Sequence, residues 1–346
     1  MYPGPSPVDV NRSLTYLMIL TRAPFRISLG GGGTDLPSYY SEHSGFLFSA
    51  AINKYVYICL TQPATEQRIQ IKYSICENVG SVGEIQHDLV RPALQLLQLN
   101  HSLEIVSMAD APAGTGLGSS SSYIVALLAA LYELKRQKIP TQELAETAFH
   151  IERNLARHPV GKQDPYLAAF GGVICLDISK NGAVKVSPLK GFEDYADEFR
   201  ARVMLFYTNQ SRSADAILQE QDLGTEKRDQ AMVDSLHRTK ELGHRISKAL
   251  QAGDLDGFGL LLDQHWENKK RRAGPISDPK LDAIYALAKR SGALGGKIIG
   301  AGGGGFFMFC CRPGRRGAVR GALAQEGLRE MPYDFDHHGA KVLVNI

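Results

Sequence analysis

The stretch Gly114–Ser122 combines residue types that bind phosphate groups. Its sequence, GTGLGSSSS, lies between a strand-like run ending near Met108 and an apolar helical pattern. Glycines let a backbone approach a triphosphate closely, the N–H groups at a helix start favour an anion, and serine hydroxyls can bind phosphate or magnesium. The stretch lacks the lysine of the motif G-x-x-x-x-G-K-[ST], so positive charge must come from elsewhere. A plain glycine-rich turn with serine caps remains the alternative.

Two further glycine runs could line a site. Gly30–Gly33 follows a strand-like segment and precedes Thr34 and Asp35, whose hydroxyl and carboxylate suit a sugar, although a loose hairpin is equally compatible. The second run, KIIGAGGGGFFMF at 297–309, has five glycines within six positions, more than a hairpin needs. A flexible lid or a crossing of strands could explain it. We favour close approach of this backbone to the active site.

Two carboxylates lie between these glycine runs. Glu152 follows Ala145 and Ala148 at helical spacing, so it leans toward the small-residue face of its helix, where an unpaired carboxylate is costly. Asp164 stands close to Lys162 at the edge of an apolar segment and could take a proton from a hydroxyl. The spacing leaves open a surface glutamate paired with an arginine, and an aspartate that caps a helix.

Composition restricts the function classes. The chain has 346 residues, enough for two domains, with 44% hydrophobic and 22% charged residues, as in ordinary globular proteins. The formal charge is +3 and the only dense basic cluster is 269–272, so we expect no nucleic-acid partner. No predicted helix has membrane length, so we expect no membrane partner. The oligomeric state stays open between a monomer and a homodimer.

Cysteine usage and the N-terminus suggest the compartment. Five cysteines include no CxxC pair, and all but Cys76 lie in apolar runs, which indicates reduced thiols in a cytoplasmic protein. Residues 1–17 contain three prolines and lack the pattern of a signal peptide. We predict a flexible extension there, before an ordered domain that begins at Met18.

Hydrophobic periodicity predicts the elements that must position these groups. Strands interrupted by two helices extend to about residue 190, and several helices lie between 213 and 290. The first helix should run from the serines to Lys138, and the second from a Thr141 cap to about Leu155. Helices on one side of an antiparallel sheet make an α+β protein. The second helix should face inward with Leu144, Ala148, Ile151 and Leu155; strands are expected at FLFSAAINKYVYICL, RIQIKY, LEIVSM, GGVICLDI, ARVMLFYT and AKVLVNI, two more around 297–309, and a helix at 315–326.

In this order, the motifs resemble those of the GHMP kinases, the superfamily of galactokinase, homoserine kinase and mevalonate kinase. The family's A-P-x-R segment before a glycine-rich Thr-Asp is matched by APFR at 23–26 and TD at 34–35. Its loop P-x-x-x-G-L-G-S-S is matched by PAGTGLGSS at 112–120, and its C-terminal glycine motif by GAGGGGFF. The resemblance implies ATP and Mg²⁺ as cofactors. It also implies a domain like ribosomal protein S5 domain 2 over 18–195 and a ferredoxin-like domain over 196–346.

Local signatures within the superfamily resemble the D-glycero-D-manno-heptose 7-phosphate kinases. The signatures are RISLGGGGTDLPSYY, GKQDPYLAAFGG, FYTNQSRSA, HWENKK and ISDPKLDAIYALAKRSGALGGKIIGAGGGGFFMF. That resemblance implies phosphorylation of the anomeric C1 hydroxyl to the 1,7-bisphosphate, for nucleotide-activated heptose and surface polysaccharide. Galactokinases carry Glu-His where this chain has Gly32 and Gly33, which argues against galactose. An L-fucokinase-like enzyme is the alternative, and a catalytically inactive regulatory relative is a third.

The resemblance implies roles for the candidate side chains. Ser120 and Glu152 would hold Mg²⁺, Arg26 would stabilise the transferring phosphoryl group, and Asp164 would take or orient the proton of the anomeric hydroxyl. Lys162 could instead lower the pKa of that hydroxyl. The implied ATP-binding residues are Pro112, Gly114, Gly116, Leu117, Gly118, Ser119, Ser120 and Ser121.

The acceptor would need its own ligands. The implied sugar-binding residues are Gly32, Gly33, Thr34, Asp35, Gly303 and Gly304. For the 7-phosphate, Arg212, Lys269 and Lys270 are the candidates, because lysine and arginine bind phosphate dianions well. A solvated basic helix end is the alternative for the two lysines.

Overall fold

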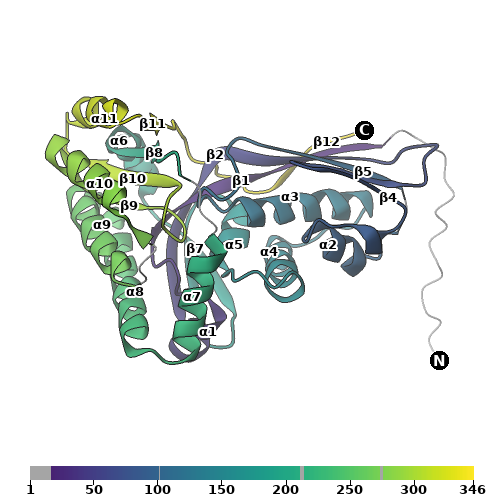
Figure 1. Ribbon diagram of the computed structural model, residues 1–346, viewed down its shortest axis with the longest axis horizontal. Coiled ribbons are helices and arrows are strands. Elements are labelled where there is room, and N and C mark those ends of the chain that lie inside the picture. Colours follow the sequence, from purple (N-terminus) through teal and green to yellow (C-terminus); the bar gives the residue numbers. More distant parts are fainter. Residues whose placement is uncertain (1–16, 101, 211–213, 273–275) are drawn as a thin grey trace.

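Two β-sheets, each covered by helices, make up the computed structural model, which describes residues 17–346 except 101, 211–213 and 273–275 (Figure 1). The predicted extension over 1–17 lies outside the described residues but for Leu17, as does Arg212. The α+β class is confirmed.

The larger sheet has eight strands in the order β12-β1-β2-β5-β3-β4, with β6 also paired to β2 and β7 to β6. Strands β3 and β5 pair in parallel, so the expectation of a purely antiparallel sheet is wrong at this pair, which the chain joins through β4 and a helix. The strands are β1 Met18–Gly30, β2 Gly45–Thr61, β3 Ile69–Lys72, β4 Cys76–Val79, β5 Leu103–Ala109, β6 Val173–Ile178, β7 Val184–Pro188 and β12 Lys341–Asn345.

One face of this sheet is covered mainly by α3, whose apolar side packs on β1 and β2 (Figure 1). Sequence periodicity predicted only two helices here; three more are too short, at seven or eight residues, to give a periodic signal. The helices are α1 Pro37–His43, α2 Val90–Leu96, α3 Ser119–Leu134, α4 Thr141–Phe149 and α5 Gln163–Phe170, with single turns at Val82–Glu84 and Phe192–Tyr195.

Three details of the two predicted helices were wrong. Helix α3 ends at Leu134 rather than Lys138, because Arg136 adopts a left-handed φ of 54°. Thr141 does not cap α4: the cap position is Pro140 and carries no side-chain hydrogen bond. After Phe149 the chain continues as one π-helical segment, His150–Leu155, which changes the helical register and leaves Leu155 44% exposed instead of inward.

The smaller sheet has the strand order β11-β8-β10-β9 and packs against α9 and α10. Its strand β8 starts at Val203, because residues 201 and 202, expected in the strand, end helix α6. The remaining elements are α6 Ala196–Arg202, β8 Val203–Tyr207, α7 Ala214–Glu226, α8 Gln230–Gln251, α9 Leu255–Lys270, α10 Pro279–Ser291, β9 Ala293–Ile298, β10 Phe306–Cys311, α11 Arg316–Gln325 and β11 Arg329–Glu330.

The two sheets are joined closely. Helix α8 lies against β1 and β2 of the larger sheet and against α9 beside the smaller one. The last strand, β12, returns from the smaller sheet to pair with β1. The predicted division between residues 195 and 196 falls at the start of α6, and it stays a prediction. Among the described helices, none is long and apolar enough to cross a membrane.

Candidate active site

The predicted phosphate loop connects β5 to α3 and presents the start of that helix. Gly114, Gly116 and Gly118 have φ values of 73°, 79° and 80°, which only glycine adopts easily. Gly118 occupies the cap position, and no side chain caps the first turn. The backbone N–H groups of this turn, and the positive end of the helix dipole, are therefore directed toward an incoming anion.

Glu152 lies beside the serines of this loop, 32 residues away in sequence. Its carboxylate accepts hydrogen bonds from the hydroxyls of Ser120 and Ser121 and is completely buried. Burial raises the pKa of Glu152 to about 7, and the two hydroxyls oppose the rise. The sequence predicted an inward glutamate, and the π-helical segment places it here.

Oxygen ligands of this kind suit Mg²⁺. No group of three or more histidine, cysteine, aspartate or glutamate side chains gathers as a metal site in the described part of the chain. Mg²⁺ commonly takes one or two protein ligands and the rest from water and nucleotide phosphates. The hydroxyl of Ser120 and the carboxylate of Glu152 fit that pattern, and a cation would balance the buried charge.

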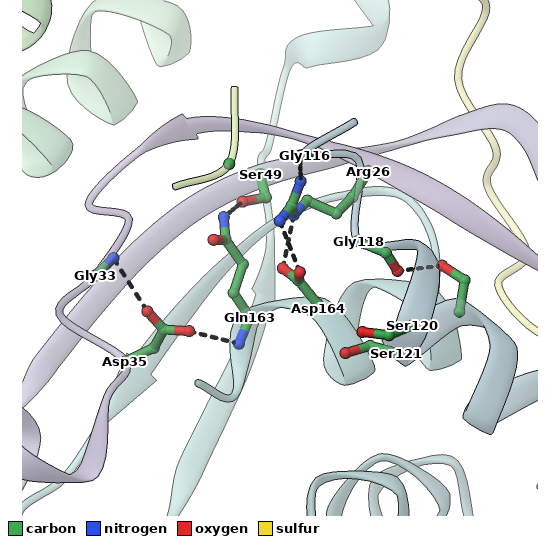
Figure 2. Close-up of polar contacts among 12 residues, drawn as sticks. Arg26, Gly33, Asp35, Ser49, Gly116, Gly118, Ser120, Ser121, Gln163 and Asp164 are labelled. Carbon is green, nitrogen blue, oxygen red and sulfur yellow. Dashed lines mark hydrogen bonds and ion pairs between the residues drawn. The ribbon is translucent and has the colours of Figure 1, made fainter. Parts of the chain in front are cut away.

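Arg26 and Asp164 form a two-pronged ion pair at the centre of the site (Figure 2). Arg26 Nε and Nη2 each lie 2.7 Å from an Asp164 oxygen, and Nη1 donates to the carbonyl of Gly116. A Cβ atom on Gly118 would lie 3.1 Å from Asp164 Oδ2, so the carboxylate packs against the phosphate loop. Two residues that are 138 positions apart are thus held together beside the loop.

Asp35 lies next to this pair (Figure 2). Its Oδ1 accepts from the N–H of Gly33 at 3.1 Å and its Oδ2 from the N–H of Gln163 at 2.9 Å. Burial raises the pKa of Asp35, with the nearby charge of Asp164 contributing. The backbone bond to Gln163 brings the predicted sugar ligand beside Asp164.

The side chain of Thr34 is buried against the backbone of its own turn and of β2. Its hydroxyl lies 2.9 Å from the carbonyl oxygens of both Gly31 and Phe46, which compete for its one hydrogen, and it accepts from the N–H of Phe46 at 3.2 Å; the residue is fully buried. It holds the turn of the glycine run against β2. The predicted sugar contact of Thr34 would therefore have to come from its backbone.

Lys162 is directed away from Asp164. Its ammonium contacts Glu146 at 2.6 Å and the carbonyl of Gly182 at 2.8 Å. Glu146 also accepts from Tyr166, so this lysine belongs to a polar network behind α5. The predicted effect of Lys162 on the acceptor hydroxyl has no support in these contacts.

The C-terminal glycine run contacts the phosphate loop directly. A Cβ atom on Gly300 would lie 2.6 Å from the Cα of Gly116, and one on Gly305 would lie 2.2 Å from the carbonyl oxygen of Thr115. The backbone of Gly303 donates to Ile276 at 2.9 Å. This run is therefore a close backbone crossing beside the loop, the arrangement that the number of glycines favoured.

Lys269 and Lys270, the two lysines expected at the 7-phosphate, point to different sides of α9. Lys269 is 6% exposed and donates to the carbonyls of Ile298 and Gly300, beneath the glycine run. Lys270 lies on another side of α9, where it pairs with Glu267 at 2.8 Å and Asp282 at 3.5 Å.

A cleft of about 490 Å³ opens beside Ser119 and Ser120, and sequence reasoning missed it. Aromatic rings line it: His87 stacks on Tyr123 with centroids 4.8 Å apart and meets Tyr73 edge-on at 4.6 Å. A mostly apolar cleft with a few polar groups suits a nucleotide base. The one sequence signal was Tyr123, which directly follows the four serines and lies one helical turn after Ser119. The cleft is lined by Val56, Tyr73, Ser74, His87, Asp88, Leu89, Ser107, Met108, Ala109, Ala111, Ala113, Ser119, Ser120, Tyr123 and His158.

Comparison with known proteins places this geometry in a family. The model "GHMP kinases N terminal domain" matches residues 88–172, and "GHMP kinases C terminal" matches residues 246–329. The first match contains the phosphate loop, Glu152 and Asp164, and the second contains the C-terminal glycine run.

Individual relatives agree with these matches. The chain is 30% identical over 338 residues to D-glycero-alpha-D-manno-heptose 7-phosphate kinase of Campylobacter jejuni, covering 93% of this chain and 98% of that protein. It is 26% identical over 330 residues to L-fucokinase/L-fucose-1-P guanylyltransferase of Bacteroides fragilis, covering 84% of this chain but 34% of that protein. A solved structure of a D-glycero-D-manno-heptose 1-phosphate kinase from Bacteroides thetaiotaomicron superposes with a TM-score of 0.78 at 29% identity, covering 94% of this chain and 99% of that one. The resemblance and the expected fold are confirmed.

Proposed function

Because this chain belongs to the GHMP kinase family, as an ATP- and Mg²⁺-dependent phosphotransferase, we propose that it phosphorylates the anomeric C1 hydroxyl of D-glycero-D-manno-heptose 7-phosphate. The product is the 1,7-bisphosphate, a precursor of nucleotide-activated heptose and surface polysaccharide. The similarity to the Campylobacter jejuni heptose 7-phosphate kinase over nearly the whole of both chains supports this substrate. We also propose a cytoplasmic location, in keeping with the five free cysteines.

The ion pair of Arg26 and Asp164, between the phosphate loop and Asp35, is the observation that carries the proposal. One side of this pair faces the loop that suits a triphosphate, and the other faces a carboxylate that suits sugar hydroxyls. A hydroxyl bound beside Asp164 would therefore lie close to both the phosphate loop and the sugar ligand Asp35. Phosphoryl transfer depends chiefly on such positioning and on charge neutralisation.

In the proposed reaction, the C1 oxygen forms a bond to the γ-phosphorus as the bond to the bridging oxygen breaks and ADP leaves. Asp164 accepts the proton of the hydroxyl, and Arg26 fixes the orientation of that carboxylate and adds positive charge beside the phosphates. Ser120 and Glu152 would hold Mg²⁺, which supplies the charge that a Walker lysine provides elsewhere. Asp35 orients the sugar through its hydroxyls.

The nucleotide would be held by groups from three segments. The N–H groups at the start of α3 bind the phosphates, the aromatic cleft beside Tyr123 receives the base, and Gly300 keeps the backbone of Gly116 in place. The roles of Gly32, Gly303 and Gly304 stay predictions.

Phosphorus NMR of the reaction products tests this proposal. The protein is incubated with heptose 7-phosphate, ATP and Mg²⁺, and the spectrum gives both the position and the anomer of the new phosphate. A new C1 phosphate signal that requires Mg²⁺ is expected. Release of ADP without a sugar 1-phosphate, or a product phosphorylated elsewhere, would contradict it.

A second candidate is a sugar 1-kinase that acts on L-fucose or on unphosphorylated heptose. The 26% identity to the Bacteroides fragilis L-fucokinase protein over 84% of this chain favours it. A substrate panel with ADP release as readout separates the two, because only the first candidate needs a phosphate on the acceptor. Turnover of any sugar would exclude an inactive regulatory protein.

A further inference from the structure

Four basic side chains are buried around the contact of β9 with β1, next to α9. Its members, here called the interior cation cluster, are His265, Lys269, Arg272 and Lys297, with exposures of 2%, 6%, 9% and 2%. Charged side chains are seldom buried to this extent without a counter-charge.

Within the described chain, no carboxylate lies within ion-pair distance of Lys269, Arg272 or Lys297. Lys269 and Lys297 each donate to backbone carbonyls, Lys297 to that of Leu29 at 3.1 Å. Among the described residues, Arg272 donates to neutral side chains, those of Gln221, Thr239 and Ser235.

The protein pairs its buried cations with acids elsewhere. Arg202, 8% exposed, pairs with Asp256, and Lys162, 5% exposed, pairs with Glu146. The interior cation cluster departs from this pattern three times in one place. A buried charge that lacks a partner costs several kcal/mol in general, so a ligand that supplies the missing negative charge would be strongly favoured.

His265 gives an independent sign of a ligand. Both of its ring nitrogens are buried, and neither has a hydrogen-bond partner among the residues that the structure describes. Buried polar atoms are nearly always hydrogen-bonded, and an unsatisfied pair on one ring indicates a missing partner. Burial lowers the pKa of His265, and the charges of Lys297, Lys269 and Arg272 lower it further. A bound anion would offset the repulsion between a protonated His265 and the three neighbouring cations.

The charged form of Lys297 is also destabilised. Burial, followed by the charges of Arg26 and Arg272, lowers the pKa of Lys297 to about 7. A bound anion would stabilise its ammonium form.

The interior cation cluster lies behind the acceptor side of the site. Lys297 holds the carbonyl of Leu29, directly before the first glycine run. Gln221 connects Arg272 to the carbonyl of Gly33 at 3.1 Å, and Gly33 in turn donates to Asp35. The cluster therefore contacts the segment that carries the proposed sugar ligand.

We propose that the interior cation cluster binds the phosphate monoester that the acceptor sugar carries in addition to the hydroxyl it presents for transfer. This inference rests on the proposed function and assigns the anion-binding role to His265, Arg272 and Lys297 together with Lys269. A phosphate dianion matches the site because it accepts several charge-assisted hydrogen bonds at once.

Inorganic phosphate is the probe for direct binding. Saturating Mg²⁺ and a non-hydrolysable ATP analogue keep the phosphate loop occupied, and the melting temperature is recorded with and without sodium phosphate at constant ionic strength. Binding to the folded state raises the melting temperature by mass action. The wild-type protein should show this rise, and Lys297→Met should lose it.

Arg202→Met is the matched control, because it removes an equally buried cation that has acidic partners. Without phosphate, Lys297→Met should melt at or above the wild-type temperature, since an unpaired buried charge is removed, whereas Arg202→Met should melt below it. The phosphate response of Arg202→Met should persist. Lys269→Met carries the same expectation as Lys297→Met and keeps the test decisive if Lys297→Met does not fold.

A kinetic arm connects the site to the acceptor. In Lys297→Met, the Michaelis constant for heptose 7-phosphate should rise by about 10- to 100-fold, the loss expected for one charged hydrogen bond, while that for ATP changes little. With heptose that lacks the 7-phosphate, the Michaelis constants of Lys297→Met and the wild type should be the same.

Three results would overturn the inference: a phosphate response that survives in both lysine variants, one that is lost equally in Arg202→Met, or one that the ATP analogue abolishes in the wild type. The proposed function fails separately. If heptose 7-phosphate is not turned over while the phosphate response depends on Lys297, the substrate is wrong and the anion site stands.

Discussion

At the scale of single residues, the site depends on buried charges that hold one another in position. Arg26 contacts both oxygens of Asp164, and its remaining nitrogen donates to the carbonyl of Gly116 in the phosphate loop. The guanidinium therefore fixes the direction of the proposed base relative to the phosphates. In the described chain, the Glu152 carboxylate instead accepts hydrogen bonds from the hydroxyls of Ser120 and Ser121.

Asp164→Ala should lower turnover by about 10²- to 10⁴-fold, the usual contribution of a positioned acid or base. ATP should still bind, because the N–H groups of the loop, rather than Asp164, are proposed to hold the phosphates. Asp164 only packs against the loop at Gly118. Steady-state kinetics and nucleotide-binding titration measure the two effects, with the melting temperature as a check on folding. Near-normal turnover would remove the proposed role.

Glu152→Gln should abolish most activity and yet stabilise the metal-free protein at alkaline pH. Turnover should fall by about 10²-fold or more, because a metal ion stabilises the transferring charge by several kcal/mol. Burial raises the pKa of Glu152 to about 7. Between its ordinary value and pH 7 the folded state holds a proton that the unfolded state has lost, so this group's contribution to stability falls as pH rises.

The free energy of unfolding, measured in urea at pH 5 and pH 8 with a chelator present, checks this expectation. The advantage of Glu152→Gln over the wild type should grow across that range, to on the order of 3 kcal/mol. Mg²⁺ with nucleotide should stabilise the wild type and not the variant. A variant that is less stable at pH 8 would indicate that the carboxylate is a structural hydrogen-bond acceptor instead.

At the scale of elements, glycine runs determine how closely the two halves approach at the site. The C-terminal run between β9 and β10 lies against the loop between β5 and α3, where Gly300 contacts Gly116. A side chain at this contact has no room. The π-helical segment after α4 has a comparable role, because it directs Glu152 toward the start of α3.

Gly300→Ala should raise the Michaelis constant for ATP, since its Cβ would lie 2.6 Å from the Cα of Gly116 and displace the loop. Gly314→Ala is the matched control: its φ of 72° is close to the 74° of Gly300, but nothing lies within 4 Å of its Cβ position. Both variants should lose about 1 kcal/mol of stability from backbone strain, and Gly300→Ala should lose more because of its contact with Gly116. Only Gly300→Ala should change the kinetics for ATP, and equal kinetics in both variants would remove the role of this contact.

At the scale of the whole molecule, a buried lysine connects the two sheets. Lys297 belongs to β9 of the smaller sheet and donates to Leu29 in β1 of the larger one. The contact therefore places an ammonium group in the interior between them. Burial, together with Arg26 and Arg272, makes its charged form costly.

Lys297→Met should be more stable than the wild type at pH 7, and the difference should shrink as pH rises toward 10. The pKa of Lys297 is about 7 in the folded state, so above that value the unfolded chain binds a proton that the folded protein does not. Stability of the wild type then rises with pH through this group. The gap at pH 7 should be on the order of 1–4 kcal/mol, as when other buried charges give way to apolar residues.

Urea denaturation at pH 7, 8 and 9.5, without phosphate, measures the gap; taking the difference between the two proteins cancels the titrating groups that do not interact with Lys297. Arg26, Arg272, His265 and Lys269 face the same interior region, and because the charge of Lys297 lowers the pKa of His265 and Lys269, the gap includes their response to its removal. A gap that widens with pH, or a variant less stable at every pH, would contradict the expectation.

The sequence by itself determined the residue types and their order. The phosphate loop, the two further glycine runs, Glu152 and Asp164 could be proposed because each lies in a short local pattern, and the α+β class followed from strand and helix periodicity. The aromatic cleft beside Tyr123 could not be found, because its rings come from three separate segments: Tyr73 follows β3, His87 lies in the loop before α2, and Tyr123 belongs to α3.

Only the tertiary structure decided which charges meet. Lys269 and Lys270 are neighbours in sequence, yet one is buried under the glycine run and the other pairs with acids on another side of α9, because successive helical side chains point about 100° apart. Lys162 contacts Glu146 rather than Asp164, because side chains two residues apart at the start of a helix do not face each other. His265, Arg272 and Lys297 carry no shared motif, and only the packing of α9 and β9 against β1 brings them together. Burial and pairing of a charge depend on contacts between distant segments, which local sequence patterns do not contain.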